Sequence, residues 1–462
     1  MFGCHAVGVL IIWFPLLLHQ HLFFVEALNL VHTWKASKGS ILTAAIVQPL
    51  REHQQPILVT GGHAGDGRIS CWKLSNNSLE GNKKETVQEI QVGSGARIHD
   101  GSIFSMASCI STHQNINYLV SGSFDRSAAI HRVDVGTSSH AVTVQTIGRL
   151  PEHTGWVRHV EAVEEKSLSP EADDERTAGT SISLLSIGCN LINTWSVLED
   201  GEVARMARLD AGPSPNDPPK EIFRRHDILT FAILGDNDGN SKAKWIVAGL
   251  VDGSIRVFVA KFEKWMRRRQ NSPYDATGSC DCPTTTTATS IAFDHQDEQD
   301  MVEHVLEDEK PFLSTNCHAG RITKIHCIQG FPDDFVSTSF DGTWVRWRID
   351  AEMKSLSKLV EGSISKAGEQ TNEGRICSST IVTENPCNDR QNNVVIYLGT
   401  SSGCLYRSWL SRGGESEKIY GNGKDASITA MTPWRHKSVE LMVACRSDGT
   451  AMLFSDDIRK YR

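Results

Sequence analysis

A short pattern of two apolar segments joined by a tight turn recurs along this chain of 462 residues, and it constrains the fold more than any other feature. Its clearest copy is DFVSTSFDGTWVRW, residues 334–347, in which Asp341 lies six residues before Trp347. The same interval recurs in four further copies: Asp66 to Trp72, Asp125 to His131, Asp252 to Phe258, and Asp448 to Phe454. Two degenerate copies have Asn190 ahead of Trp195, and Ser402 and Gly403 ahead of Trp409, which makes seven related units.

Each unit predicts four short strands. Alternating apolar residues on both sides of Asp-Gly are typical of two strands joined by a hairpin turn. Another strand-like segment precedes each pair, and a fourth fits between units, as in TVQEIQV from Thr86. The preceding segments begin at Ser40, Ser102, Trp156, Ile228, Arg321, Arg375 and Ser427.

Seven such units resemble the WD-repeat family, in which four-stranded blades are arranged radially into a β-propeller. The resemblance implies an all-β chain in which residues 28–462 form a single seven-bladed propeller of four-stranded antiparallel blades. The chain departs from the family pattern in having no Trp-Asp dipeptide and in turns spaced more widely than the family's about 40–45 residues. Loop insertions account for the wider spacing.

The resemblance also implies a hydrogen-bonded tetrad within each well-formed blade. In the family a His before the first strand, a second-strand Ser or Thr, the turn Asp and a third-strand Trp are linked, and burial of the His and Asp requires such partners. The fifth unit matches best, with His318, Ser337, Asp341 and Trp347. The second unit has His99, Ser121, Asp125 and then His131 in place of Trp, and the fourth has His226, Asp252 and Phe258. These residues are predicted to be structural, so no catalytic residue is expected among them.

The first 27 residues carry an apolar segment with three interpretations. Small or modest residues at Val25 and Ala27 are compatible with a cleaved signal peptide that ends before Leu28. An uncleaved membrane anchor, with the remainder facing the cytosol, and an incorrect translation start are the alternatives. Localisation thus stays open between secretory or organellar entry and the cytosol. The next segment, Leu28 to Trp34, is predicted to supply the missing outer strand of the last blade.

Two polar insertions interrupt the repeats. Residues 165–180 are acidic and predict a flexible loop. Residues 261–316 combine the basic KFEKWMRRRQ with an acidic end, so they predict either an interaction arm anchored by Trp265 or a disordered loop. Cys280 and Cys282, even with Cys317 and His318, lack the spacing of a zinc site, and no metal is expected.

Composition and motifs exclude several function classes. A net charge of −8 argues against a broad nucleic-acid surface, although it leaves a local basic site open. The Gly-rich residues 61–67 lack the Lys and following helix of a phosphate-binding loop, so no cofactor is expected. The twelve cysteines do not form a disulfide framework. We therefore expect a protein that is not an enzyme.

The remaining prediction is a scaffold that binds other proteins, as a monomeric propeller within a complex. In the family, partners contact the residues that begin each first strand and the residue before the turn Asp. Transferred to this chain, these positions are Ser102, Trp156, Ile228, Arg321, Phe124, Val251 and Phe340, with Arg158 two residues into its strand. Aromatic and Arg side chains dominate interfaces, so the predicted partner-binding residues are Phe124, Trp156, Arg158, Arg321 and Phe340.

Three alternatives remain at this point. Phe124 and Phe340 could simply pack over their turns. The chain could be a substrate adaptor of a ubiquitin ligase, although WRID at Trp347 departs in order from the adaptor motif Trp-Asp-x-Arg. With a genuine signal peptide, it could be a lumenal propeller that binds a ligand or acts as an enzyme.

Overall fold

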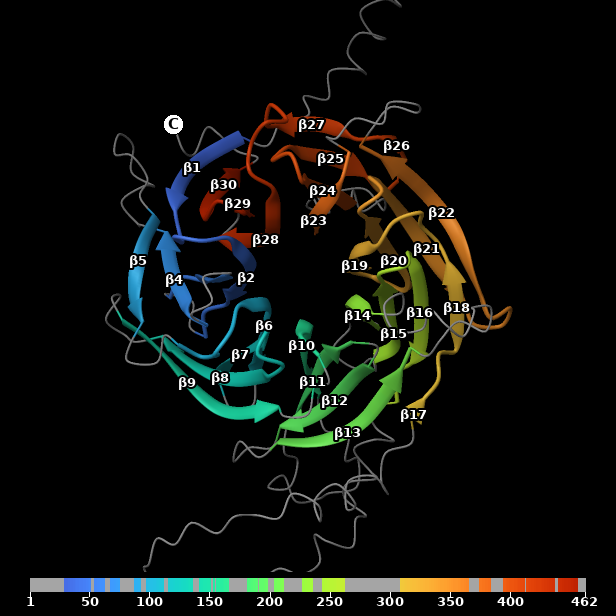
Figure 1. Cartoon of the computed structure of the whole chain (residues 1–462), viewed down its shortest axis with the longest axis horizontal. Helices are drawn as coiled ribbons and strands as arrows, with labels where there is room; N and C mark the ends of the chain where they lie inside the picture. Colours follow the sequence, from blue (N-terminus) through green and yellow to red (C-terminus); the bar gives the residue numbers. More distant parts are fainter. Residues whose placement is uncertain are drawn as a thin grey trace, which may run out of the picture.

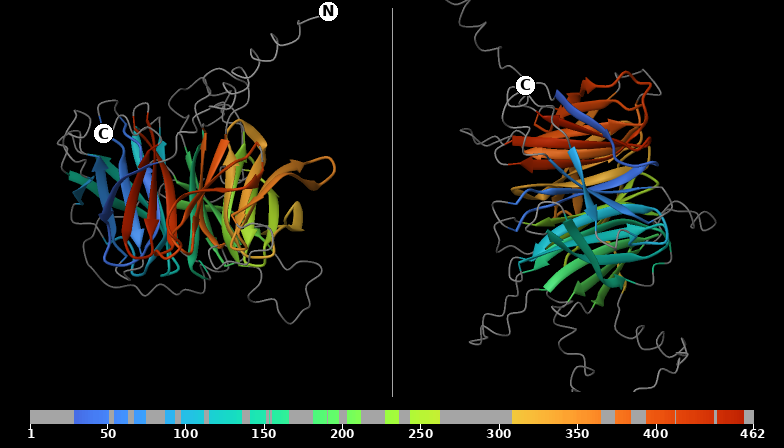
Figure 2. Two further views of the ribbon diagram at one scale, coloured as in Figure 1. Left: turned by 90° about the horizontal axis from the view of Figure 1, so that it is seen from above. Right: turned by 90° about the vertical axis from the view of Figure 1, so that its left-hand side faces the viewer.

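The chain folds into a ring of seven four-stranded antiparallel blades around a central opening, as a computed structural model shows (Figures 1 and 2). The described residues contain strands and turns but no helix. The first strand of each blade lies innermost, beside the opening (Figure 1). The structure describes residues 29–50, 54–62, 67–74, 87–92, 97–111, 115–135, 141–150, 153, 155–165, 181–189, 191–197, 203–211, 227–235, 243–261, 308–364, 374–383, 394–411, 413–436 and 439–455.

The seven blades follow one another in sequence order. Blade one is β2 (Ile41–Val47), β3 (Ile57–Gly62), β4 (Ile69–Leu74) and β5 (Val87–Val92). Blade two is β6 (Ile103–Ser111), β7 (Ile116–Ser123), β8 (Ala128–Val135) and β9 (Ala141–Leu150). Blade three is β10 (Val157–Glu165), β11 (Ser181–Gly188), β12 (Leu191–Val197) and β13 (Val203–Asp210). Blade four is β14 (Ile228–Gly235), β15 (Ala243–Leu250), β16 (Ser254–Val259) and β18 (Leu313–Asn316).

The last three blades complete the ring. Blade five is β19 (Ile322–Ile328), β20 (Phe331–Ser339), β21 (Thr343–Asp350) and β22 (Ser355–Ser363). Blade six is β23 (Ile376–Thr383), β24 (Val394–Thr400), β25 (Leu405–Trp409) and β27 (Glu417–Tyr420). Blade seven is β28 (Ile428–His436), β29 (Val439–Arg446), β30 (Thr450–Ser455) and the N-terminal β1 (Asn29–Lys35).

The N-terminal strand closes the ring. β1 pairs antiparallel with β30, with Leu30 opposite Phe454 and Trp34 opposite Ala451. The closing strand predicted at Leu28 to Trp34 is therefore confirmed within one residue at each end. Because the first and last parts of the chain share one sheet, opening the ring requires breaking that sheet.

Short parallel pairings join the outer strands of neighbouring blades. β9 runs beside the end of β5, which merges blades one and two into one eight-stranded sheet. β17 (Asp308–Glu309) pairs with β13, and β26 (Gly414–Glu415) pairs with β22. Residues 308–309 and 313–316, which lie inside the segment predicted as an insertion, thus form strands, and β18 is the outer strand of blade four.

The apolar core consists of seven layers, one between each pair of adjacent blades. Between blades three and four, for example, Leu185 and Ile192 pack against Phe231 and Ile246. The other six clusters repeat this arrangement around the ring. Strands covered on both faces explain why many second strands are almost uninterrupted apolar segments.

Two backbone features let the blades approach each other near the opening. A β-bulge follows the first residue of all seven first strands. In addition, a glycine in the second strand of one blade packs against the first residue of the first strand of the next blade. A Cβ atom on Gly249 would lie 2.5 Å from Ile322 Cγ2, and a Cβ atom on Gly399 would lie 2.5 Å from Ile428 Cγ2. Only glycine fits at such a distance.

Residues 1–27, most of residues 165–180 and residues 262–307 lie outside the described part of the chain. The predictions for a signal peptide or anchor, for Trp265 and for Cys280 and Cys282 fall there. In the described part, no helix is long and apolar enough to cross a membrane.

Candidate functional site

One hydrogen bond recurs in five blades and defines the side of the ring that we call the turn face. The residue before each turn donates its backbone N–H to the carbonyl of the residue that precedes the first strand of the same blade. The pairs are Phe124 to Ser102, Val251 to Asp227, Phe340 to Arg321, Ser401 to Arg375, and Ser447 to Ser427, at 2.9–3.0 Å. Each of these blades therefore presents two neighbouring positions next to the opening.

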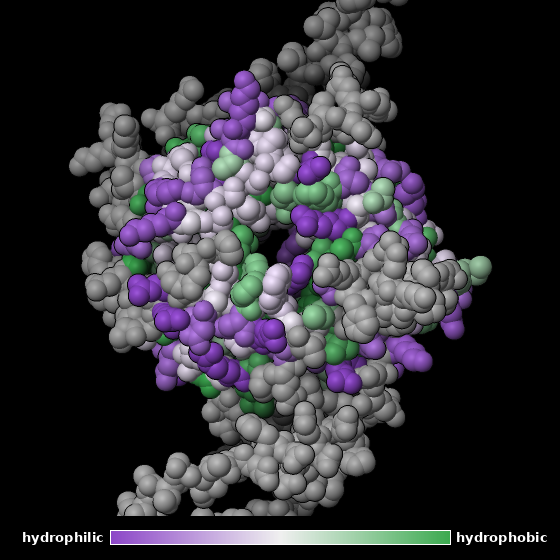
Figure 3. Space-filling model, in the orientation of Figure 1, coloured by the Kyte–Doolittle hydropathy of each residue, from purple (hydrophilic) through white to green (hydrophobic). Residues whose placement is uncertain are grey.

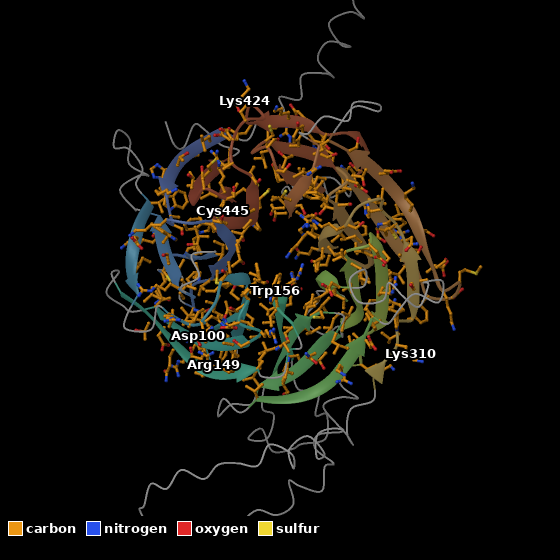
Figure 4. All side chains as sticks on the ribbon, viewed as in Figure 1. Asp100, Arg149, Trp156, Lys310, Lys424 and Cys445 are labelled. Atoms are coloured by element: carbon orange, nitrogen blue, oxygen red, sulfur yellow. The ribbon has the colours of Figure 1, made fainter. Side chains whose placement is uncertain are left out.

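Three aromatic side chains from blades two and three gather on this face, and we call them the aromatic cluster. The ring centroids of Phe124 and Trp156 lie 4.5 Å apart, and Phe104 lies 6.2 and 6.1 Å from them. Phe124 is 44% exposed and Trp156 is 41% exposed, although they contact each other. Trp156 lies at the inner edge of the ring, beside the opening (Figure 4). Large apolar side chains left half-exposed together are typical of binding surfaces.

Arg158 extends the aromatic cluster toward blade four. Its guanidinium carbon lies 5.3 Å from the Trp156 ring centroid, within range of a cation–π interaction. One of its terminal nitrogens lies 3.9 Å from a carboxylate oxygen of Asp227, a long ion pair between half-buried groups. Arg158 is therefore partly neutralised and held beside the aromatic rings.

A second group, which we call the arginine pair, lies on blades five and six. The guanidinium carbons of Arg321 and Arg375 lie 4.1 and 5.1 Å from the centroid of the Phe340 ring. Both arginines are exposed, whereas Phe340 is half-buried between blades. The space-filling view shows the resulting mixture of hydrophilic and apolar side chains around the opening (Figure 3).

The structure brings the predicted partner-binding residues together in two groups rather than in one. Phe124, Trp156 and Arg158 belong to the first group, and Arg321 and Phe340 belong to the second. The prediction that Ile228 contacts partners on this face was wrong, because Ile228 is fully buried. Like Ile322 in blade five, it is the first residue of its strand and lies directly before the β-bulge. Asp227 takes that position instead. Ser102 is also buried, at 4% exposure.

Phe104 and Arg375 also belong to these groups, although neither was predicted from the sequence. Arg375 immediately precedes Ile376 just as Arg321 precedes Ile322, so extending the same rule to the sixth unit finds it. Phe104 has no such signal, because its inclusion depends on the bulge that turns the second residue of β6 toward Phe124.

The fifth blade contains the full tetrad. Ser337 Oγ accepts a hydrogen bond of 2.8 Å from Trp347 Nε1 and lies 2.7 Å from His318 Nε2. Asp341 accepts hydrogen bonds from the backbone and hydroxyl of Thr343, and its other oxygen lies 3.7 Å from His318 Nδ1. Burial would raise the pKa of Asp341, but the nearby His318 and the hydrogen bonds from Thr343 lower it well below its usual range. These contacts join β20, β21 and the turn between them to the loop that precedes the blade.

The second blade builds the same network with a histidine in place of tryptophan. Ser121 Oγ lies 2.7 Å from His99 Nε2 and 2.8 Å from His131 Nε2, and His99 Nδ1 lies 3.0 Å from Asp125. Burial lowers the pKa of His131 to about 3, and the charges of His99 and Arg149 act in the same direction. His131 is therefore neutral at pH 7 and occupies the place of an apolar residue.

Other blades contain part of the network. In blade three, Ser186 Oγ lies 2.7 Å from His153 Nε2 and accepts a hydrogen bond from Trp195 Nε1. In blade four, Asp252 accepts hydrogen bonds from Ser254, but His226 lies outside the described residues.

A polar network connects the innermost strands of several blades. Lys324 Nζ in β19 lies 3.4 Å from His159 Nδ1 in β10, and His159 Nε2 lies 3.7 Å from Glu161. Next to Lys324, His326 Nε2 lies 2.7 Å from Ser379 Oγ in blade six. Burial lowers the pKa of Lys324, His159 and His326, the last to about 3. The network bridges blades three, five and six across the ring.

The described residues include no group of three or more acidic, His or Cys side chains placed to hold a metal ion. The described cysteines are free thiols, several of them buried in the core. Burial raises the pKa of Cys71 and Cys445 to about 12, so these two thiols are unreactive fillers.

No protein-family model matches the chain, and no curated protein is significantly similar to it in sequence.

Proposed function

We propose that this propeller is a non-enzymatic interaction platform of the WD-repeat type, which binds protein partners on its turn face. The observation that carries the proposal is the aromatic cluster, in which Phe124 and Trp156 are both more than 40% exposed at the inner edge of the ring. Aromatic side chains that pack against each other on a rigid scaffold lose little conformational entropy on binding, which makes them strong anchors. The tetrad-like contacts of blades two, three and five favour WD-repeat membership.

The rest of the turn face supports this proposal. Cation–π contacts hold Arg158 and Arg321 in place before any partner arrives, so fewer side chains have to be ordered on binding. In blades two and five the tetrad His is hydrogen-bonded to a Ser of the same blade, and Asp125 is hydrogen-bonded to His99, as expected for structural groups. We expect a monomeric ring that works within a larger complex and does not bind nucleic acid.

The test is quantitative affinity capture from cells with the full chain. Replacing Phe124 and Trp156 by Ser should remove the specific partners while leaving the thermal unfolding of the ring unchanged within a few degrees. A matched control replaces Met353 and Leu359, two exposed apolar residues of the β21–β22 hairpin, which projects from the rim of the ring (Figure 2). Equal capture by the wild type and the Phe124/Trp156 variant would refute the proposal, and loss of partners in the control variant would assign binding to the rim instead.

A further inference from the structure

We propose that the arginine pair recognises carboxylates, so that the partner on the turn face is an acidic peptide segment which also carries an apolar residue for the aromatic cluster. This inference rests on the proposed function and deepens it by stating the chemistry of the partner.

The geometry of the arginine pair is that of a prepared carboxylate site. Two guanidiniums from different blades share one aromatic ring, at 4.1 and 5.1 Å from its centroid. A guanidinium that stacks on a ring has its flat face covered, while its N–H groups point outward along the edge. Those edges are the groups that form paired hydrogen bonds with a carboxylate.

The positive charge of the pair has no counter-charge in the described part of the chain. Neither Arg321 nor Arg375 lies within ion-pair distance of a described carboxylate. By comparison, Arg158 has Asp227, and Arg446 in blade seven has Asp425 and Asp448. Two like charges gathered on one ring repel each other, and an incoming anion relieves that repulsion.

The positions of the two arginines are fixed by the backbone as well as by the ring. The carbonyl of Arg321 accepts the N–H of Phe340, and the carbonyl of Arg375 accepts the N–H of Ser401. Both positive charges also act on Cys377, the second residue of β23: burial raises the pKa of its thiol, and the two arginines oppose that rise. The backbone bonds fix where each arginine begins, and the contacts with the Phe340 ring place both guanidiniums on the same part of the face.

The remaining positions of the turn face explain why the segment should be both acidic and apolar. Blades two and three present the aromatic cluster, and blades five and six present the arginine pair. Blade four, between them, presents Asp227, which Arg158 partly neutralises. On a chain with a net charge of −8, the arginine pair is a local positive site that attracts anionic groups.

The experiment measures binding of the full chain to arrays of dodecamer peptides. One array has a central Leu-Phe pair flanked by Asp and Glu, a second has Asn and Gln in the acidic positions, and a third has phosphoserine there. The wild type should bind the acidic array about tenfold more tightly than the amide array, with a preference that weakens as salt is raised. Replacing Arg321 and Arg375 by Ala should reduce that preference to within about threefold.

A control variant, R132A/K358A, removes two exposed cations elsewhere and should keep the wild-type preference, since Arg132 and Lys358 pair locally with Asp134 and Glu361. Equal binding of the acidic and amide arrays by the wild type, or a preference retained in R321A/R375A, would overturn the inference while leaving the proposed function in place. Binding only to the phosphoserine array would replace carboxylate by phosphate recognition. If no array binds, both proposals are contradicted. If all arrays bind equally and only F124S/W156S loses that binding, the turn face binds apolar peptides without a preference for acidic ones, which supports the proposed function alone.

Discussion

Ser337 offers a sharp test of how the tetrad stabilises a blade. Its hydroxyl is fully buried, accepts a hydrogen bond from Trp347 and contacts His318. Ser337→Ala leaves both of those groups without a partner, and each buried unsatisfied group costs about 1–3 kcal/mol. We therefore expect the free energy of unfolding to fall by about 3 kcal/mol.

The assay is urea unfolding followed by circular dichroism. Small proteins have urea m-values of about 1–3 kcal/mol/M and larger chains have higher ones, so the midpoint should move down by at most about 1 M while the slope stays constant. Trp347→Phe should cost less, because His318 still contacts Ser337. The double variant should reveal a coupling energy of about 1 kcal/mol between the two positions.

Ser183 in β11 is the matched control. It is also fully buried, but its hydroxyl has no hydrogen-bond partner among the described residues. Ser183→Ala should therefore change the free energy of unfolding by no more than about 0.5 kcal/mol, or increase it. If Ser337→Ala costs no more than Ser183→Ala, the tetrad does not stabilise the blade and the reasoning is wrong.

Three further predictions follow from the packing and the charges. Gly249→Ala should cost about 1–3 kcal/mol in thermal or urea unfolding, because the added methyl group would overlap Ile322, and an unchanged stability would show that blades four and five can separate freely. His131 has a folded pKa of about 3 against an ordinary value of 6.5, so the unfolded chain takes up a proton at a higher pH than the folded chain does. The free energy of unfolding should therefore fall as the pH drops from 6.5 toward 3, by up to about 1.4 kcal/mol per pH unit. His131→Trp should reduce that slope in acid titrations, and an equal slope in the variant would contradict the prediction. A chain that begins at Lys38 lacks β1 and should expose the edge of β30. It should be cleaved faster in limited proteolysis and should self-associate in gel filtration, whereas a chain that begins at Leu28 should behave as the full ring. Identical behaviour of the two chains would exclude β1 as the closing strand.

Much of the fold was accessible from local patterns. The interval between Asp341 and Trp347 reflects one hairpin, and a hairpin is built from residues that are neighbours in sequence. Seven such hairpins predict seven blades, and the strand character of Leu28 to Trp34 predicted the closing strand β1. The parallel links of β17 and β26 to the preceding blades had no signal, since each is only two residues long.

The same distinction between local geometry and packing of whole blades applies to the candidate site. The sequence by itself determined which residues begin a strand or precede a turn, and so it identified Phe124, Trp156 and Arg321, because those positions depend on local backbone geometry. Only the tertiary structure decided which of them meet: the bulge buries Ile228, brings Phe104 to Trp156, and sets Arg375 of blade six against Phe340 of blade five. Contacts between blades depend on how whole sheets pack around the ring, and no spacing within one unit specifies that packing.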